Sequence, residues 1–238
     1  MGDSVIEKIV NWLLQQLQDS KSSGFILGLS GGLDSSVCAA LILMATKNCL
    51  GLILPIESKT DDIEDAASLA AEFSMQTAHL DLTSVYNGMI KLLPTQDKVA
   101  FGNIKARLRM IALYYYANLN NYLVCGTGNK TELMLGYFTK YGDGACDILP
   151  LGDLYKHEVR QIAETLNIPE AIIEKTPSAG LWRGQTDEGE IGFLYDQMDK
   201  TLDEIDQGQI SGICAEKLHK MIEKNIHKRR LPVICSLK

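Results

Sequence analysis

The chain has 238 residues, of which 46% are apolar and 22% charged, and its formal net charge is −7. This composition is typical of a folded chain long enough for one large domain, and it excludes an intrinsically disordered protein. The acidic balance argues against non-specific binding to nucleic acid or to an anionic membrane, but it leaves room for an anionic ligand in a locally positive cleft.

The elements predicted along the chain alternate between helix and strand. Residues 1–23 form an amphipathic helix, and their acids and missing basic start argue against a secretory signal. Four short apolar runs then alternate with longer helical patterns. This order predicts an α/β chain, with a single doubly wound parallel sheet that has helices on both faces. The predicted strands are 25–29, 50–55, 77–82 and 122–126, and the predicted helices are 35–47, 60–74, 83–92 and 100–118.

Beyond Gly126 the regular alternation stops. Residues 136–153 are rich in Gly and Asp, and residues 176–190 have no apolar period, so both are predicted to be long loops. The second loop contains Trp182 among small and polar residues, which suits a lid over a ligand; an ordinary surface loop is the alternative. Residues 211–234 predict a helix that ends in a basic cluster.

The cysteines and the hydropathy together predict a cytoplasmic protein. No apolar run reaches the roughly 18 residues that a membrane span needs. The six cysteines contain no C-x-x-C pair and several lie in apolar runs, so we expect reduced, buried thiols. The four histidines are scattered, and they do not suggest a zinc site.

The stretch GFILGLSGGLDSSV at 24–37 joins the first predicted strand to the next helix. Ligands of parallel sheets bind beyond the carboxyl ends of the strands, where glycine amides, hydroxyl groups and a helix N-terminus together bind phosphate. The stretch is not a Walker loop, and in GTGNKT at 126–131 Asn129 stands where a Walker loop needs Gly. Asp34 would repel a phosphate unless a cation lay between them, so it predicts a magnesium-bridged polyphosphate; helix capping is the alternative.

The motif S-G-G-x-D-S at 30–35 resembles the PP-loop of the ATP pyrophosphatases, which cleave ATP between its α and β phosphates. The rest of the chain resembles the ammonia-dependent NAD synthetases of that superfamily. The resemblance implies one domain over 1–238 with the adenine nucleotide alpha hydrolase-like (PP-loop ATPase) fold, the PP-loop at 28–36 and a lid at 176–190. The stretches that carry it are GNIKARLRMIALYYYA (102–117), GTGNKTELMLGYFTKYGDGACDILPLGDLYKHEVR (126–160) and EKTPSAGLWRGQTDEGEIG (174–192).

The resemblance implies a reaction and a role for individual residues. Deamido-NAD, ATP and ammonia would give NAD⁺, AMP and pyrophosphate through an adenylated intermediate. Asp34 and Glu132 would hold Mg²⁺, and the implied catalytic residues are Asp143, which would take a proton from ammonium, and Lys156. The implied ATP contacts are Gly28, Leu29, Ser30, Gly31, Gly32, Leu33, Asp34, Ser35, Thr127, Lys156 and Ser178, and the implied deamido-NAD contacts are Arg107, Lys140, Asp147, His227 and Lys228.

Several of these residues have plainer interpretations when the resemblance is set aside. Glu132 would be a surface acid, Arg107 a solvated helix arginine, Asp143 a turn residue and 227–230 the basic end of a helix. Ser178 differs from the Thr that other members carry there, but it keeps the hydroxyl group.

The resemblance also implies a homodimer with the dinucleotide site near the interface, and the tyrosines at 114–116 suit either that interface or core packing. Three rival functions are another PP-loop amidoligase, a tRNA-modifying ATP pyrophosphatase and a nucleotide sensor without chemistry. The net charge and the length disfavour a tRNA enzyme, and the presence of both Asp34 and Glu132 disfavours a sensor. We expect no nucleic-acid or membrane partner.

Overall fold

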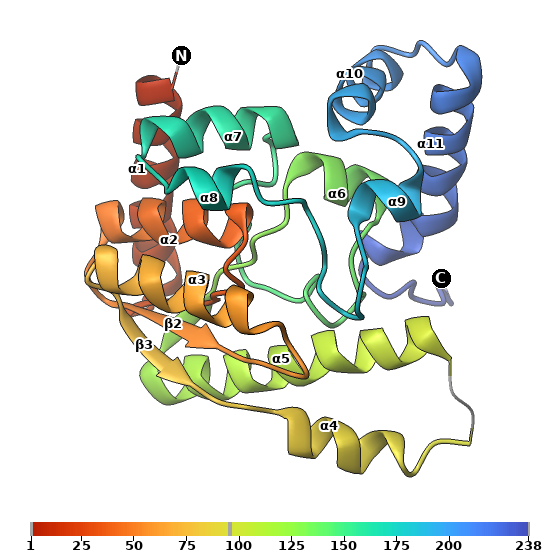
Figure 1. Cartoon of the computed structure of the whole chain (residues 1–238). Helices are drawn as coiled ribbons and strands as arrows, with labels where there is room; N and C mark the ends of the chain where they lie inside the picture. The colour runs from red at the N-terminus through yellow and green to blue at the C-terminus, as the bar shows by residue number, and fades with distance from the viewer. Residues whose placement is uncertain (1, 95–96, 238) are drawn as a thin grey trace.

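Figure 1 shows the computed structural model of the chain, which describes residues 2–94 and 97–237. Four parallel strands form one sheet in the order β3-β2-β1-β4, and all four predicted strands begin within one residue of their predicted starts. The strands are β1 (Gly24–Gly28), β2 (Cys49–Ile53), β3 (Gln76–His79) and β4 (Tyr122–Val124).

Helices cover both faces of the sheet, which confirms the predicted α/β fold (Figure 1). Successive residues of a strand point to opposite faces. In β1, Phe25 and Leu27 therefore lie in one core and Ile26 in the other. The first core contains residues of α1 (Gly2–Ser20), α2 (Leu33–Ala45), α3 (Thr60–Glu72) and α7 (Lys156–Thr165), and the second contains residues of α4 (Thr83–Ile90) and α5 (Lys98–Asn120).

A third apolar cluster joins the helices that flank the carboxyl end of the sheet. Tyr195 and Met198 of α10 pack with Leu218 of α11 and Leu135 of α6. Sequence reasoning predicted α11 but neither α6 nor α10. Part of the predicted loop 176–190 is also helical, because Thr186 caps a short helix that begins at Asp187. The bounds are α6 (Lys130–Leu135), α8 (Glu170–Ile173), α9 (Asp187–Ile191), α10 (Tyr195–Asp206), α11 (Gly212–Asn225) and the 3₁₀ helix η1 (Ile226–Lys228).

The strand order reverses beside β1. The chain moves outward from β1 to β2 and β3, and then returns through α5 to β4 on the other side of β1. In open parallel sheets, ligands bind at the carboxyl end of the strands where the order reverses. The turns that follow β1 and β4 are therefore the expected site, and they contain the predicted PP-loop and Thr127.

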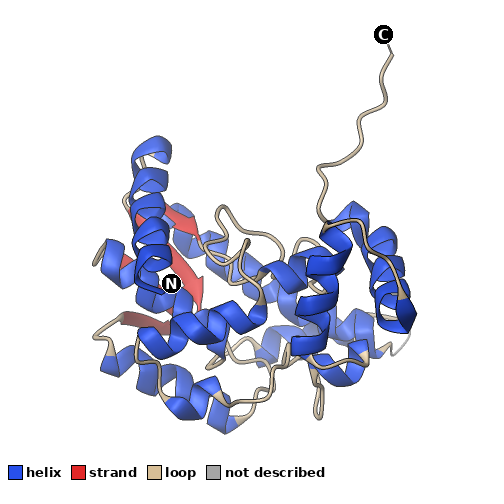
Figure 2. Cartoon of the chain, turned by 90° about the horizontal axis from the view of Figure 1, so that it is seen from above, coloured by secondary structure: helices blue, strands red, loops and turns tan. Residues whose placement is uncertain are grey.

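The end of the chain leaves the body of the molecule after η1 (Figure 2). Its apolar side chains Leu231, Val233, Ile234 and Leu237 are exposed. None of the helices described in the structure is both long and apolar enough to cross a bilayer.

Candidate active site

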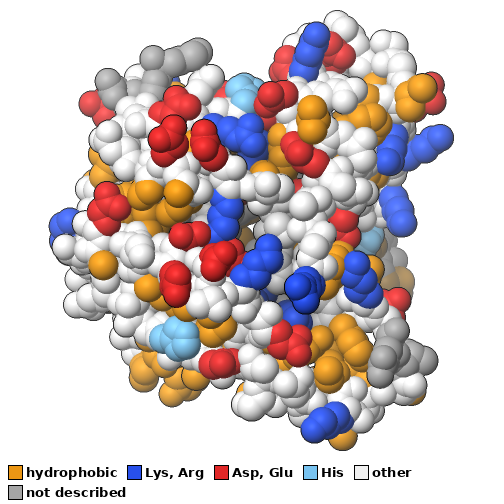
Figure 3. All heavy atoms as spheres, in the orientation of Figure 1, with side chains coloured by type: hydrophobic (Ala, Val, Ile, Leu, Met, Phe, Trp, Pro, Cys, Tyr) orange, Lys and Arg blue, Asp and Glu red, His pale blue; other side chains and the backbone are white. Residues whose placement is uncertain are grey.

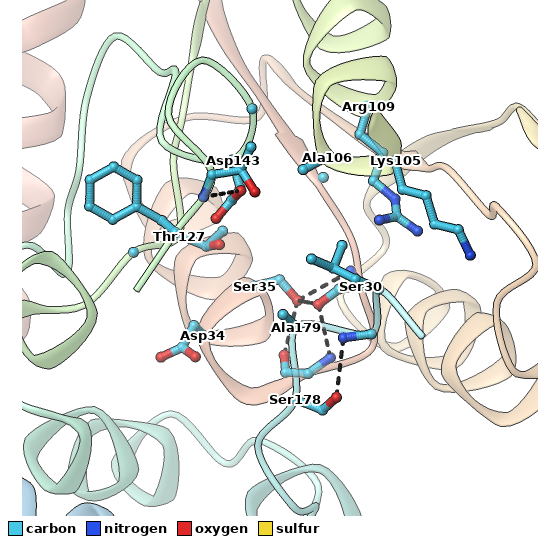
Figure 4. Close-up of a pocket in the computed structure, with 18 of the residues that line it drawn as sticks. Ser30, Asp34, Ser35, Lys105, Ala106, Arg109, Thr127, Asp143, Ser178 and Ala179 are labelled. Carbon is cyan, nitrogen blue, oxygen red and sulfur yellow. Dashed lines mark hydrogen bonds between the residues drawn. The ribbon is translucent and has the colours of Figure 1, made fainter. Parts of the chain in front are cut away.

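The turn between β1 and α2 is held by its own hydroxyl groups (Figure 4). Ser35 Oγ accepts a hydrogen bond from the Ser30 amide at 3.3 Å and donates to the Gly32 carbonyl at 2.9 Å. Ser30 Oγ accepts from the Gly32 amide at 3.2 Å. Gly32 is the N-cap of α2 and supplies no side-chain cap, so the first amides of this helix stay available to an anion.

The next helix along the chain fixes the same loop from outside. Gly31 has a φ of +73°, and a Cβ atom there would lie 2.3 Å from the Asp62 carbonyl oxygen, so this position needs glycine. Lys175 Nζ lies 2.7 Å from Asp62, 2.6 Å from Asp65 and 3.2 Å from the Gly31 carbonyl oxygen. Lys175 therefore ties the phosphate loop to α3.

Asp34 lies in a buried charge cluster at the N-terminus of α2. Its carboxylate forms an ion pair with Lys156, whose side chain is 3% exposed. Asn129 links Asp34 to Glu132: its side-chain amide lies 3.3 Å from Asp34 Oδ1, and its backbone N–H donates to Glu132 Oε2 at 3.2 Å. Asn129 and Glu132 form a capping box at the start of α6. Local helix capping thus brings the second predicted metal ligand toward the first.

Burial and neighbouring charges shift the protonation of this cluster. Burial, together with the Asp34 charge, raises the pKa of Glu132 to about 8, and Lys156 opposes the shift. Burial lowers the pKa of Lys156, but Asp34, Glu132 and Asp187 outweigh that effect and raise it above the usual value. Acids outnumber the cation here, so the cluster can accept further positive charge.

The donor set suits magnesium that arrives with a nucleotide. Mg²⁺ usually keeps one or two carboxylates and completes its shell with water and phosphate oxygens. Within the described residues, no group of three or more His, Cys, Asp or Glu side chains could hold a metal ion. Asp187 adds a further polar atom near the cluster, because its Oδ1 is buried and accepts no hydrogen bond within the described part of the chain. These features fit a nucleotide-borne ion better than a resident one.

Asp199 of α10 holds Lys156 in place indirectly. Its buried carboxylate accepts from the Thr131 hydroxyl at 2.5 Å and from the His157 amide at 3.0 Å. Thr131 Oγ1 in turn accepts from the Lys156 amide at 3.3 Å. The start of α7, which carries Lys156, is thereby fixed to the start of α6, which carries Glu132.

We expect Asp199→Asn to lower the rate of pyrophosphate release from ATP by about tenfold and the stability by about 1–3 kcal/mol. An amide offers one acceptor oxygen, so it cannot accept from both the Thr131 hydroxyl and the His157 amide with the same geometry. Turnover, KM for ATP and thermal unfolding check this. Asp203→Asn, an exposed acid on the same helix, is the matched control. Equal turnover in the two variants would contradict the prediction.

The predicted lid at 176–190 is folded against α5. Ser178 Oγ donates to the Gln185 carbonyl at 2.8 Å, and Gln185 Oε1 accepts from the Leu181 amide at 2.8 Å. A Cβ atom at Gly102 of α5 would lie 3.1 Å from the Trp182 ring, so glycine allows the close packing. Internal bonds and this contact show that the segment is not a loose surface loop, and its role as a lid stays a prediction.

Four of the five predicted deamido-NAD contacts meet around the segment 136–144. Arg107 Nη2 donates to the Lys140 carbonyl at 3.2 Å, and Lys140 Nζ donates to the His227 carbonyl at 2.6 Å. Lys228 Nζ donates to the carbonyls of residues 136 and 138 at 2.7 and 2.8 Å. The fifth, Asp147, accepts instead from the Tyr114 hydroxyl at 3.2 Å and from a backbone amide of β4 at 2.7 Å.

Asp143 lies on the cavity wall in the same segment. Its Oδ1 accepts from the Thr139 amide at 2.9 Å. Desolvation raises the pKa of Asp143, and the Thr139 amide opposes this shift. Figure 4 shows Asp143 beside Thr127, across the cavity from Lys105 and Arg109.

One cavity of about 1280 Å³ is lined by the phosphate loop and by predicted site residues from other elements, namely Thr127, Glu132, Asp143, Lys156, Ser178 and Lys228. Within the described residues, Arg107, Lys140, Asp147 and His227 are not part of its lining. Pockets for one drug-sized ligand measure roughly 300–1,000 Å³, so this cavity is larger than a single such ligand needs. Figure 3 shows Lys and Arg side chains, with acids among them, around the hollow in this face.

Sequence reasoning missed several residues of the cavity and its support. Asn129 was noticed only as a departure from a Walker loop, although the pattern N-x-x-E before an apolar run is a capping-box signal. Arg109 stands two residues after Arg107 and was passed over. Asp199 had no sequence signal, because its partners Thr131 and His157 are far away in the chain.

Comparisons with known proteins agree with this geometry. The sequence model of the family described as NAD synthase matches residues 5–232. The chain is 45% identical to an NH(3)-dependent NAD(+) synthetase of Carboxydothermus hydrogenoformans, over 96% of this chain and 95% of that protein. It is 42% identical to the protein of the same name from Archaeoglobus fulgidus, over 99% and 98%.

Two solved structures resemble the whole chain. The NMN synthetase from Francisella tularensis superposes with a TM-score of 0.94 at 37% identity and covers 100% of this chain and 99% of its own. An NH3-dependent NAD synthetase from Campylobacter jejuni, in complex with the nitrate ion, superposes with a TM-score of 0.87 at 32% identity and covers 99% of each chain.

Proposed function

The chain belongs to the NAD synthase family, and on that premise we propose that its cavity amidates deamido-NAD with ammonia and ATP, giving NAD⁺, AMP and pyrophosphate. Its relatives are ligases, and they align with it over nearly their whole length. The observation that carries the ATP half of the proposal is the Asp34–Lys156 pair beside the uncapped N-terminus of α2, at the point where the strand order reverses.

The reaction needs two substitutions, because a carboxylate is a poor electrophile. An oxygen of the nicotinate carboxylate attacks the α-phosphorus of ATP, and the bond to the bridging oxygen breaks with release of pyrophosphate. Ammonia then adds to the carbonyl carbon of the acyl-adenylate and loses a proton, and AMP leaves with the electron pair of the C–O bond. Both steps depend on positioning and on neutralising phosphate charge.

The ATP half of the cavity supplies that neutralisation. Amides and hydroxyl groups of residues 28–35 bind the phosphates, and the Lys156 ammonium neutralises their charge. Thr127 and Ser178 contact ATP from the end of β4 and from the lid. Magnesium held by Asp34 and Glu132 would supply positive charge to the leaving pyrophosphate.

The other half of the cavity binds the acid substrate. Lys228 lines the cavity, and Arg107, Lys140 and His227, which are bonded to the segment 136–144 or to one another, are proposed to bind phosphates and ribose of this substrate. Asp147, whose carboxylate accepts from a backbone amide of β4, is the fifth proposed contact. Asp143 takes the proton from ammonium or from the attacking ammonia, since a carboxylate on the cavity wall with a raised pKa is suited to act as a base.

Pyrophosphate release tests this function. Purified protein is given ATP, Mg²⁺ and ammonium with deamido-NAD, xanthosine monophosphate or aspartate. We expect release with deamido-NAD and NAD⁺ as its product. Release with another acid alone would favour a different PP-loop amidoligase, and release with an unmodified tRNA alone would favour a tRNA-modifying enzyme.

A second candidate acid is nicotinate mononucleotide, which differs from deamido-NAD by the absence of the AMP half. The high structural similarity to a protein named NMN synthetase favours testing it. The same assay decides between the two acids through the ratio of their kcat/KM values, which measures differential binding in the transition state.

We also propose that two chains associate through α4 and α5. Ile111 and Tyr115 are 59% and 63% exposed, and they lie one and two turns beyond Arg107 on the same face of α5. Val85 and Met89 of α4 are exposed as well. A large exposed apolar patch on a folded chain marks an interaction surface, and Arg107 would place the acid substrate beside it.

Ile111→Glu is therefore expected to yield a monomer. Light scattering after gel filtration should give twice the chain mass of 26.3 kDa for the wild type and the chain mass for the variant. A charge placed in a buried interface costs several kcal/mol, and each 1.4 kcal/mol lowers the affinity of the dimer tenfold. Ile213→Glu, at an 84% exposed position on α11, is the control and should stay dimeric. A monomeric wild type at micromolar concentration would contradict the proposal.

We further propose one domain over 1–238 and a cytoplasmic location. One family model matches residues 5–232, which is nearly the whole chain. All six cysteines are free, as is usual for proteins of a reducing compartment.

A further inference from the structure

Arg109 of α5 lies on the wall of the cavity at the carboxyl end of β2. Its Nε donates to the Leu54 carbonyl at 3.0 Å, and Nη2 lies 3.5 Å from Ser58 Oγ. Figure 4 shows the guanidinium directed from α5 toward the phosphate loop. Two neutral acceptors therefore hold this side chain in one orientation in the free protein.

The charge of Arg109 is not balanced by an ion pair within residues 2–94 and 97–237. None of the ion pairs among the described residues includes it. Lys105, one turn earlier on the same helix, shows the opposite case: it lies 2.8 Å from Glu57 Oε2 and 4.8 Å from the centre of the Tyr86 ring. Desolvation lowers the pKa of Arg109, and the charge of Asp143 opposes this shift. A guanidinium nevertheless stays charged in proteins, so the cavity wall carries a cation that has no ion-pair partner in the described part of the chain.

The position of Arg109 relative to the phosphate loop follows from the register of the sheet. Gly28 of β1 pairs with Leu52 of β2. Ser30 and Leu54 each follow this pair by two residues, just beyond the ends of the two neighbouring parallel strands, and both line the cavity with Arg109. The group that binds Leu54 therefore lies on the same edge of the sheet as the loop that begins at Ser30. An anion bound at that loop would lie next to the unpaired guanidinium.

We propose that Arg109 binds a phosphate group of a nucleotide in the cavity. Its N–H groups that have no partner among the described residues face the cavity, and a planar guanidinium matches two oxygens of a phosphate. The assignment rests on the proposed function, under which two phosphate-bearing substrates enter this cavity. Either ATP or the acid nucleotide would supply the same chemistry, so binding is measured for each separately.

The test compares Arg109→Met with wild type in calorimetric binding of two probes. One is α,β-methylene-ATP with Mg²⁺, which cannot release pyrophosphate, and the other is deamido-NAD. We expect Kd for one probe to rise about 10- to 100-fold, because hydrogen bonds to a charged group contribute about 1.5–3 kcal/mol. The probe that weakens identifies the source of the phosphate. Its Kd should also lose part of its dependence on salt, which a structural role through Leu54 would leave unchanged.

Two further variants complete the experiment. Lys220→Met removes an exposed charge of α11 outside the cavity and should bind both probes as the wild type does. Arg109→Lys keeps the charge without the planar fork and should lie between wild type and Arg109→Met; it also serves as the test if the Met variant does not fold. Wild-type affinity for both probes in the folded variant overturns the proposal. Failure of the wild type to bind either probe would instead refute the proposed function.

Discussion

Asp34→Asn is expected to lower pyrophosphate release from ATP by about a thousandfold. The carboxylate is replaced by a neutral group of the same shape, so the cluster loses the acid that pairs with Lys156 and that would hold magnesium. Loss of a single preorganised electrostatic group from an active site commonly lowers turnover 10²- to 10³-fold, and here the same substitution removes a predicted metal ligand as well. Steady-state release of pyrophosphate with saturating ATP measures the effect.

The same variant should remain folded. Breaking a buried ion pair can destabilise a protein strongly, but Glu132 and Asp187 still balance the charge of Lys156. We therefore expect a loss of activity much larger than the loss of stability. Binding of Mn²⁺ in the presence of α,β-methylene-ATP, followed by electron paramagnetic resonance, should weaken in Asp34→Asn and in Glu132→Gln. Asp61→Asn, an exposed acid of α3, is the control. Normal turnover in either active-site variant would remove that residue from the proposed metal site.

Lys156→Met is expected to lower the rate of pyrophosphate release from ATP by 10²- to 10³-fold, because it removes a positive charge and not a metal ligand. The buried ammonium is the cation nearest to Asp34 and one of the groups proposed to neutralise the phosphates of ATP. Met keeps most of the side-chain volume and removes the charge, so the variant tests charge and not packing.

The two variants should differ in their affinity for the metal. Mn²⁺ should bind Lys156→Met at least as well as the wild type, since Asp34 and Glu132 are kept and a competing cation is gone. Lys200→Met, exposed on α10, controls for a general effect of lost charge. If Lys156→Met turned over ATP normally, the proposed role of this ammonium would be wrong.

Local chemistry explains why the first half of the fold could be predicted. The strands β1, β2 and β4 are short and mostly apolar runs, and each predicted helix between the strands has its own period, so the alternation of β1 to β4 with α2 to α5 can be recognised without tertiary information. The phosphate loop could be recognised for the same reason: its glycines, its hydroxyl groups and Asp34 are contiguous in the chain. The helices α6, α7, α8 and α10 were missed: α6 and α8 are only six and four residues long, and α10 is rich in acids.

The sequence by itself determined which chemical groups the protein has and where its strands begin, and it predicted a phosphate site after the first of them. These properties depend on residues adjacent in the chain, where propensity and spacing act directly. Only the tertiary structure decided which of those groups meet. Lys156 contacts Asp34 across 122 positions, and Asp199 holds the start of α7 from another helix. Arg109 has no ion-pair partner among the described residues, because the cavity wall, and not the sequence around it, supplies its neighbours. Electrostatic energy depends on distance in space and on burial, so these properties belong to the folded chain alone.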